Sequence, residues 1–115
     1  MAAFGSKLRT AQGNHLIFWC PGCNETHVVG YGAGVGPRWC WNGSGDKPTF
    51  TPSIKVTHDA HPDASEEFKE WRTARCCHSF VTDGRIQFLA DCTHALAGQT
   101  VDLPDFPRHD WEDGD

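Results

Sequence analysis

Alternating apolar and polar side chains, the pattern typical of β-strands, recur along this chain. The alternation is clearest in residues 49–57, where apolar side chains take every second position, and it predicts a half-buried antiparallel strand. Pro52 interrupts that strand with a residue that has no backbone N–H, which predicts a sheet edge or a bulge. Residues 15–20 are apolar on both faces and predict a central strand, and residues 27–31 predict the strand that returns beside it.

A β-hairpin is predicted in the second half of the chain. Two runs rich in apolar and β-branched residues flank Asp83 and Gly84, a pair that favours a type I′ turn. With that turn as the loop, Cys77 lies opposite Ala90 and becomes a diagonal neighbour of Cys92, about 7 Å or less away at the backbone. The hairpin therefore brings two thiols together at the end farthest from its turn.

The remaining pattern predicts one mainly β domain over residues 1–115. Only residues 63–74 have a helical pattern, with acidic side chains early and arginine late. The expected fold is a small antiparallel sheet or sandwich with one short helix. Residues 1–14 are polar and aperiodic, with room for one short strand. They and residues 105–115, which end in an acidic tail, are expected to be loosely ordered.

Composition excludes several classes of protein. The net charge is −5 and no basic stripe is present, which disfavours binding to nucleic acid. No stretch approaches the ~20 apolar residues of a membrane span, and the first residues lack the apolar region of a secretory signal. We therefore expect a protein of the reducing cytoplasm, where its six cysteines are more typical of metal ligands than of disulfides.

The CPGC motif from Cys20 to Cys23 has the form of a zinc knuckle, a tight turn whose two sulfurs point the same way. Two thiolates from this knuckle and two from the hairpin, Cys77 and Cys92, would complete a tetrahedral Zn²⁺ site. A zinc ribbon has two such knuckles and this chain has one. The second pair of ligands therefore depends on the inferred hairpin register.

Histidine and aspartate side chains flank this predicted metal site. His94 and His27 each follow a predicted ligand closely in the sequence, so either could replace Cys77 in the coordination sphere or support it from outside. His78 and Asp91 share the other face of the hairpin, where a carboxylate could orient an imidazole behind a metal or as a base. A hydrogen-bonded polar pair at the end of the sheet is the alternative for these two.

Several blocks of the chain resemble a known family. They are FWCPGC at residues 18–23, WNG at 41–43, PTFTPS at 48–53, CHSFV at 77–81, DGRIQFL at 83–89 and DCTHALAGQTVDLP at 91–104. Over residues 15–104 the chain resembles small bacteriophage and prophage proteins of unknown function, some of which carry the label ammonia monooxygenase. The resemblance implies a phage origin, an infected bacterial cell as the setting and a zinc site. It implies no established activity.

Two functions from different classes follow as hypotheses. The first is an interaction module with structural zinc that binds a host or phage protein in the cytoplasm of the infected cell. It ranks first because four thiolates would fill the coordination sphere and leave no open position. The alternative is a small zinc-dependent hydrolase or nucleotide-processing enzyme that uses His78, His94 and Asp91 as its catalytic group.

Overall fold

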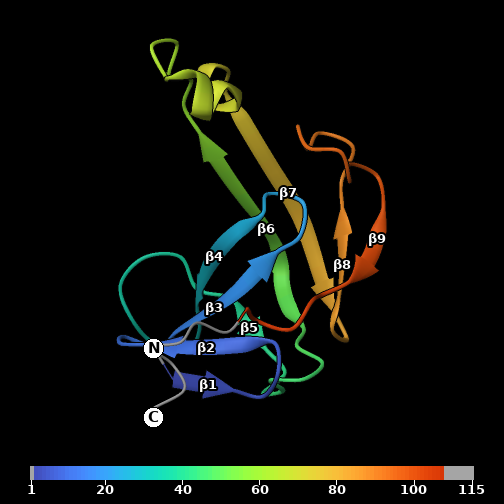
Figure 1. Ribbon diagram of the computed structural model, residues 1–115. Coiled ribbons are helices and arrows are strands. Elements are labelled where there is room, and N and C mark those ends of the chain that lie inside the picture. The colour runs from blue at the N-terminus through green and yellow to red at the C-terminus, as the bar shows by residue number, and fades with distance from the viewer. Residues whose placement is uncertain (1, 108–115) are drawn as a thin grey trace.

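Two antiparallel sheets and one short 3-10 helix make up the fold in the computed structural model, which describes residues 2–107 (Figure 1). The first sheet has four strands in chain order: β1 (Ala2–Phe4), β2 (Leu8–Ala11), β3 (His15–Cys20) and β4 (Glu25–Gly30). The second has five: β5 (Cys40–Trp41), β6 (Phe50–His58), β7 (Arg75–Thr82), β8 (Arg85–Phe88) and β9 (Thr100–Asp102). The prediction of a mainly β fold with one short helix is confirmed.

The two sheets share one apolar core. Its largest buried side chains include Leu16 and Phe18 of the first sheet and Phe50, Ile86 and Phe88 of the second. The rings of Phe18 and Phe50 stack with their centroids 6.2 Å apart. This packing holds β3, which ends at the CPGC motif, against β6.

The N-terminal residues contain two strands, where the sequence pattern left room for one. β1 and β2 pair with each other, and β2 pairs with β3 so that Leu8 lies opposite Phe18. Strands of three and four residues are too short for their alternation to be recognised in the sequence. At the other end, the Phe106 N–H donates to the Ser6 carbonyl at 2.9 Å and the Arg9 guanidinium lies over the Phe106 ring. The acidic tail at residues 110–115 falls outside the described residues.

β6 and β7 form a long two-stranded ribbon with the helix at its far end (Figure 1). The register shifts between Phe50 and Ile54, so Pro52 lies at a bulge, one of the two places its missing N–H predicted. The helix, η1 (Glu66–Arg72), is shorter than the predicted 63–74 and is interrupted by a non-helical Phe68. None of its residues is buried, so no packed apolar stripe extends it into an α-helix. Among residues 2–107, no helix has the length and apolar character that a membrane crossing requires.

Candidate functional site

The predicted hairpin is present and has the predicted loop. β7 pairs with β8, and Ser79 lies opposite Phe88 as expected from a turn at Asp83 and Gly84. Both turn residues have positive φ, 50° and 76°, which is the conformation of a type I′ turn. The hairpin therefore has the register from which the predicted ligands were derived, as far as the end of β8.

Beyond β8 the ladder contains two extra residues. The Leu89 N–H donates to the His78 carbonyl and the Thr93 N–H donates to the Cys76 carbonyl, each at 2.9 Å. In an uninterrupted antiparallel ladder the residue opposite Cys76 would be residue 91, because one strand advances two positions as the other goes back two. The chain therefore loops out between Leu89 and Thr93, and every later residue is displaced by two positions along the hairpin.

This displacement corrects the place expected for Cys92. Its thiol does not join the other cysteines. It lies 3.2 Å from both the backbone N–H and the carbonyl oxygen of His78. His94, two residues further on, takes the place that the unbroken register gave to Cys92. His94 therefore replaces Cys92 in the cluster, whereas the predicted alternative had a histidine in place of Cys77.

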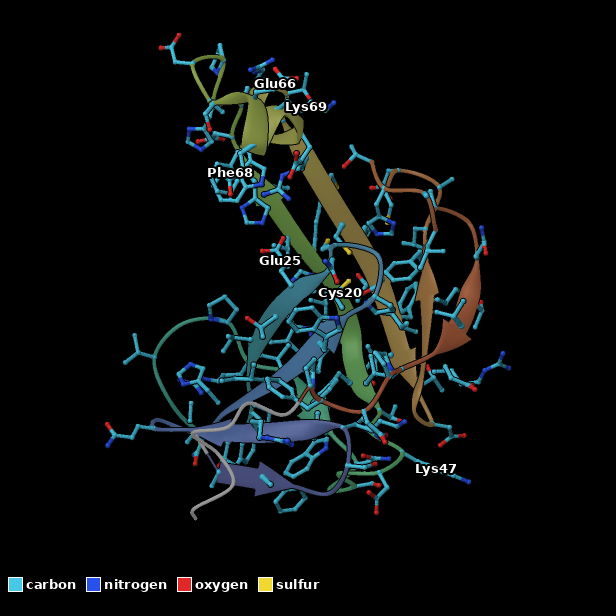
Figure 2. The ribbon with its side chains drawn as sticks, in the orientation of Figure 1. Cys20, Glu25, Lys47, Glu66, Phe68 and Lys69 are labelled. Carbon is cyan, nitrogen blue, oxygen red and sulfur yellow. The ribbon has the colours of Figure 1, made fainter. Side chains whose placement is uncertain are left out.

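Three thiols and one imidazole converge where β3 meets β7, near Cys20 (Figure 2). The candidate ligand atoms of Cys20, Cys23, Cys77 and His94 all lie within 4.8 Å of one another. The Cys23 N–H donates to the Cys20 sulfur at 3.4 Å, and the sulfurs of Cys20 and Cys77 are 3.8 Å apart. A Cβ atom at Gly22 would overlap the His94 ring, so glycine within the motif permits the imidazole to approach.

Hydrogen bonds among the three thiols shift their pKa values in opposite directions. Hydrogen bonds from the thiols of Cys23 and Cys77 lower the pKa of Cys20 far below its ordinary value. The hydrogen bond to Cys20 raises the pKa of Cys23 to about 12, and a hydrogen bond to Cys20 also raises that of Cys77. A divalent ion would favour the thiolate form of all three. The His94 Nε2 atom is buried and has no hydrogen-bond partner among residues 2–107, which fits a ligand atom.

His27, the other alternative ligand, lies beside this cluster and outside it. Its side chain is 3% exposed and packs edge-on against Phe18 with ring centroids 5.6 Å apart. The imidazole is close enough to Cys20 to contribute to lowering the pKa of that thiol. Its place is therefore that of a supporting group next to the thiolate.

A second group of polar side chains lies on the outer face of β6 and β7. The Oδ2 atom of Asp91 is 3.1 Å from Nδ1 of His78, and Nε2 of His78 is 3.0 Å from Oγ of Ser53. His78 and Asp91 were predicted to share a face, and they lie together here. The looped-out residues after Leu89 carry Asp91 to His78, while Ser53 lies in the bulge of β6.

This arrangement is that of a Ser-His-Asp triad, which is recognised by geometry rather than by sequence order. With its proton on Nδ1, the His78 imidazole donates to Asp91 and accepts from the Ser53 hydroxyl. Side chains of His78 and Asp91 are 24% and 49% exposed, so a substrate could reach the site. Side chains hold the backbone of both Ser53 and His78. The Trp39 indole donates to the Ser53 carbonyl at 3.2 Å, and the Cys92 thiol contacts the backbone of His78.

Ser53 is the residue that the sequence analysis missed. It was assigned to the polar face of an alternating strand, and no G-x-S-x-G motif surrounds it. Its position next to Pro52 was the available signal, because bulges redirect side chains and are over-represented beside active sites. The pairing of β6 with β7 was also needed to place it near His78.

The fold and the site together define a small β-sheet protein with a hydrogen-bonded Ser-His-Asp group and a separate cluster of side chains that could hold a metal ion. Residues 4–89 match the family model for BubE, described as a bacterial ubiquitination-like system serine protease. Because the match covers most of the chain, this protein belongs to the BubE family. Ser53 and His78 lie within the matched residues and Asp91 lies just beyond them. No curated protein and no solved structure matches the chain. The phage origin implied by the resemblance stays a prediction.

Proposed function

We propose that this protein is a serine protease that acts in a bacterial ubiquitination-like system. The hydrogen-bonded chain from Ser53 through His78 to Asp91 carries this proposal. The description of the BubE family supports it independently, because that description names the same class of nucleophile. Ser53 is the proposed nucleophile, His78 the general base and Asp91 the group that orients the imidazole.

The proposed reaction is acyl transfer through a covalent intermediate. Ser53 Oγ attacks the carbonyl carbon of the scissile bond and gives its proton to Nε2 of His78. The protonated imidazole, stabilised by Asp91, then donates that proton to the leaving amine as the carbon–nitrogen bond breaks. Water attacks the resulting ester with His78 again as base, which releases the carboxylic acid and regenerates the Ser53 hydroxyl.

We further propose that Cys20, Cys23, Cys77 and His94 hold a structural Zn²⁺ ion. Three cysteines and one histidine form a common closed, tetrahedral zinc site with no open position for substrate. The buried, unpartnered Nε2 of His94 and the missing Cβ of Gly22 support this set. Zinc supplies stability at such a site, whereas the bond-breaking chemistry is assigned to Ser53 and its partners.

The three residues of the predicted zinc hydrolase, His78, His94 and Asp91, belong to two different sites in this proposal. His78 and Asp91 belong to the triad, whereas His94 lies among the thiols. A role as an interaction module, with a host or phage protein as partner in the cytoplasm of an infected cell, stays a prediction. A protein substrate of the protease would itself be such a partner.

A fluorophosphonate probe tests the proposed nucleophile. We expect the probe to modify Ser53 in the intact protein, as identified by mass spectrometry of the labelled peptide. Ser53→Ala should abolish labelling, and His78→Asn should slow it by about 10²-fold or more because the general base is lost. Ser65→Ala removes an exposed serine and is the matched control. Absence of labelling, or labelling that survives Ser53→Ala, would refute the assignment.

A further inference from the structure

One edge of β6 is open beside the proposed nucleophile. Along one edge, residues 54–58 of β6 pair with β7. Along the other edge, β6 pairs with β5 only at Phe50 and Thr51. In the part of the chain that the structure describes, no strand pairs with residues 54–58 on this second edge. The open segment begins directly after Ser53.

Hydrogen bonds on β7 show which backbone groups face the opening. The N–H and carbonyl of His78 point away from β6, because their partners are Cys92 and Leu89. Backbone groups of successive residues point to alternate edges, so the neighbours of His78 on β7 point toward β6. Lys55, which lies opposite His78, therefore directs its own N–H and carbonyl to the open edge, and so does Thr57.

These backbone groups lack partners in the described chain. No hydrogen bond of residues 2–107 outside the paired strands involves the N–H or carbonyl of Lys55 or Thr57. Both residues are exposed. On the other side of Ser53 the edge is occupied, because the Trp39 indole donates to the Ser53 carbonyl at 3.2 Å and β5 follows. The opening is therefore limited to one side of the nucleophile.

We propose that the substrate of this protease is an extended, unpaired segment of a protein that adds to β6 as an antiparallel strand. The proposal rests on the protease function above. Backbone groups of the segment would pair with those of Lys55 and Thr57, as in other cases of β-strand addition. In the antiparallel direction the segment runs from Thr57 toward Ser53, so the paired residues are those that precede the scissile bond.

Two consequences for specificity follow from this binding mode. Pairing through backbone groups tolerates many side chains but requires an extended segment, so a tail or linker would be cleaved and a folded domain would not. The chain after the scissile bond must leave the sheet, because Trp39 and β5 occupy the edge there. Phe80 is 41% exposed and shares the outer face of β7 with His78, where it offers an apolar contact to a substrate side chain.

The test compares peptide phosphonates that have backbone N–H groups with peptide phosphonates that lack them. Pooled acyl-tetrapeptide diphenyl phosphonates with mixed side chains would be reacted with the intact protein, beside the same pool methylated on its backbone nitrogens. Methylation removes the N–H donors that an added strand needs and leaves the reactive group unchanged. We expect the unmethylated pool to modify Ser53 about 10-fold faster or more, since each lost backbone hydrogen bond costs binding.

Variants of the edge itself complete the experiment. Thr57→Pro removes one N–H from the open edge, a position where proline is tolerated in strands. A carbonyl of the bound peptide then loses its donor, so the unmethylated pool should modify Ser53 about 5-fold more slowly. Thr57→Ala retains the N–H and should retain the rate. Equal rates for the two pools with the unmodified protein would overturn the edge proposal. Failure of a small fluorophosphonate to label Ser53 would instead overturn the protease function, so the two failures are distinguishable.

Discussion

Adjacent residues on β7 serve two different sites. Cys77 is buried among the thiols, whereas His78 is partly exposed on the other face, between Ser53 and Asp91. Cys92 contacts the backbone between the two sites. Its sulfur accepts from the His78 N–H, which a regular ladder would pair with another strand, and its thiol also contacts the His78 carbonyl, which accepts from the Leu89 N–H. The residue that was predicted to bind metal therefore contacts the backbone of the proposed catalytic base.

Replacement of Cys92 tests whether this residue supports His78 or binds metal. Cys92→Ala leaves the partly buried N–H of His78 without its partner, and we expect it to lower the free energy of unfolding by about 1 kcal/mol. Labelling of Ser53 should slow, while the amount of bound metal stays the same. Chemical denaturation and metal analysis measure the two effects. Cys40→Ala, at an exposed thiol, is the control, and loss of metal from Cys92→Ala would contradict the assignment.

Gly22 offers a second test at the same scale. Its Cα lies so near the His94 ring that any Cβ would overlap the imidazole. Gly22→Ala should therefore displace His94 and weaken metal binding about 10-fold or more, with the three thiols still present. Competition with a chromophoric chelator measures the affinity. Gly43→Ala is the control for the loss of a glycine, because no atom lies within 4 Å of the added Cβ. Gly43 has a positive φ, so this variant also carries backbone strain, and it should nevertheless bind metal as the unmodified protein does.

At the scale of elements, both partners of His78 come from irregularities in the ladder. Ser53 lies where β6 advances four residues, from Phe50 to Ile54, while β7 advances two. Asp91 lies in the loop between Leu89 and Thr93, where two residues are likewise extra. The two extra residues in each place change how far along the ladder Ser53 and Asp91 lie from His78, and leave the face of each side chain unchanged.

The same irregularities explain what could be read from the sequence. Alternation and the turn at Asp83 predicted the strands, the hairpin and the His78–Asp91 pair. These features depend only on the local sequence pattern and on which face of the hairpin each side chain occupies. Ser53 and His94 depend on insertions of two residues, which preserve the face of every side chain and therefore leave the alternating pattern unchanged. Only the pairing of the strands in space shows where those residues are located.

Removing the insertion tests this explanation directly. Deletion of Ala90 and Asp91 would remove the two extra residues and leave Thr93 opposite Cys76, so His94 would keep its place beside the thiols. We expect the shortened protein to bind Co²⁺ through the same three thiolates, which an unchanged thiolate-to-cobalt absorption would report. Labelling of Ser53 should fall about 10²- to 10⁴-fold because Asp91 is lost. Asp91→Asn, which removes the charge and keeps the loop, should show the same loss of labelling. Loss of cobalt binding from the deletion, with Asp91→Asn unaffected, would contradict the two-residue shift.

At the scale of the whole molecule, the cluster of Cys20, Cys23, Cys77 and His94 joins the two sheets. Cys20 and Cys23 come from the end of β3 and the turn that follows, whereas Cys77 and His94 belong to the hairpin of the second sheet. Glu25 of β4 reinforces this junction, with a carboxylate oxygen 3.7 Å from Arg75 and 3.3 Å from His58 (Figure 2). An ion at this place would fix the segment that carries His78 and the segment that carries Asp91 relative to the core.

Metal removal should therefore disable the triad and loosen the junction between the sheets. Structural zinc contributes roughly 10 kcal/mol or more of apparent binding free energy, as much as the stability of a typical domain. We expect a chelator to lower the unfolding temperature by more than 10 °C and to suppress fluorophosphonate labelling of Ser53, with both restored by Zn²⁺. Cys20→Ser should reproduce both losses without a chelator, whereas Cys76→Ser, whose thiol lies outside the four-residue cluster, should reproduce neither. If the metal-free protein unfolded at the same temperature and was labelled at the same rate, the cluster would have no part in holding the triad, and packing of Phe18 against Phe50 would have to fix the two sheets unaided.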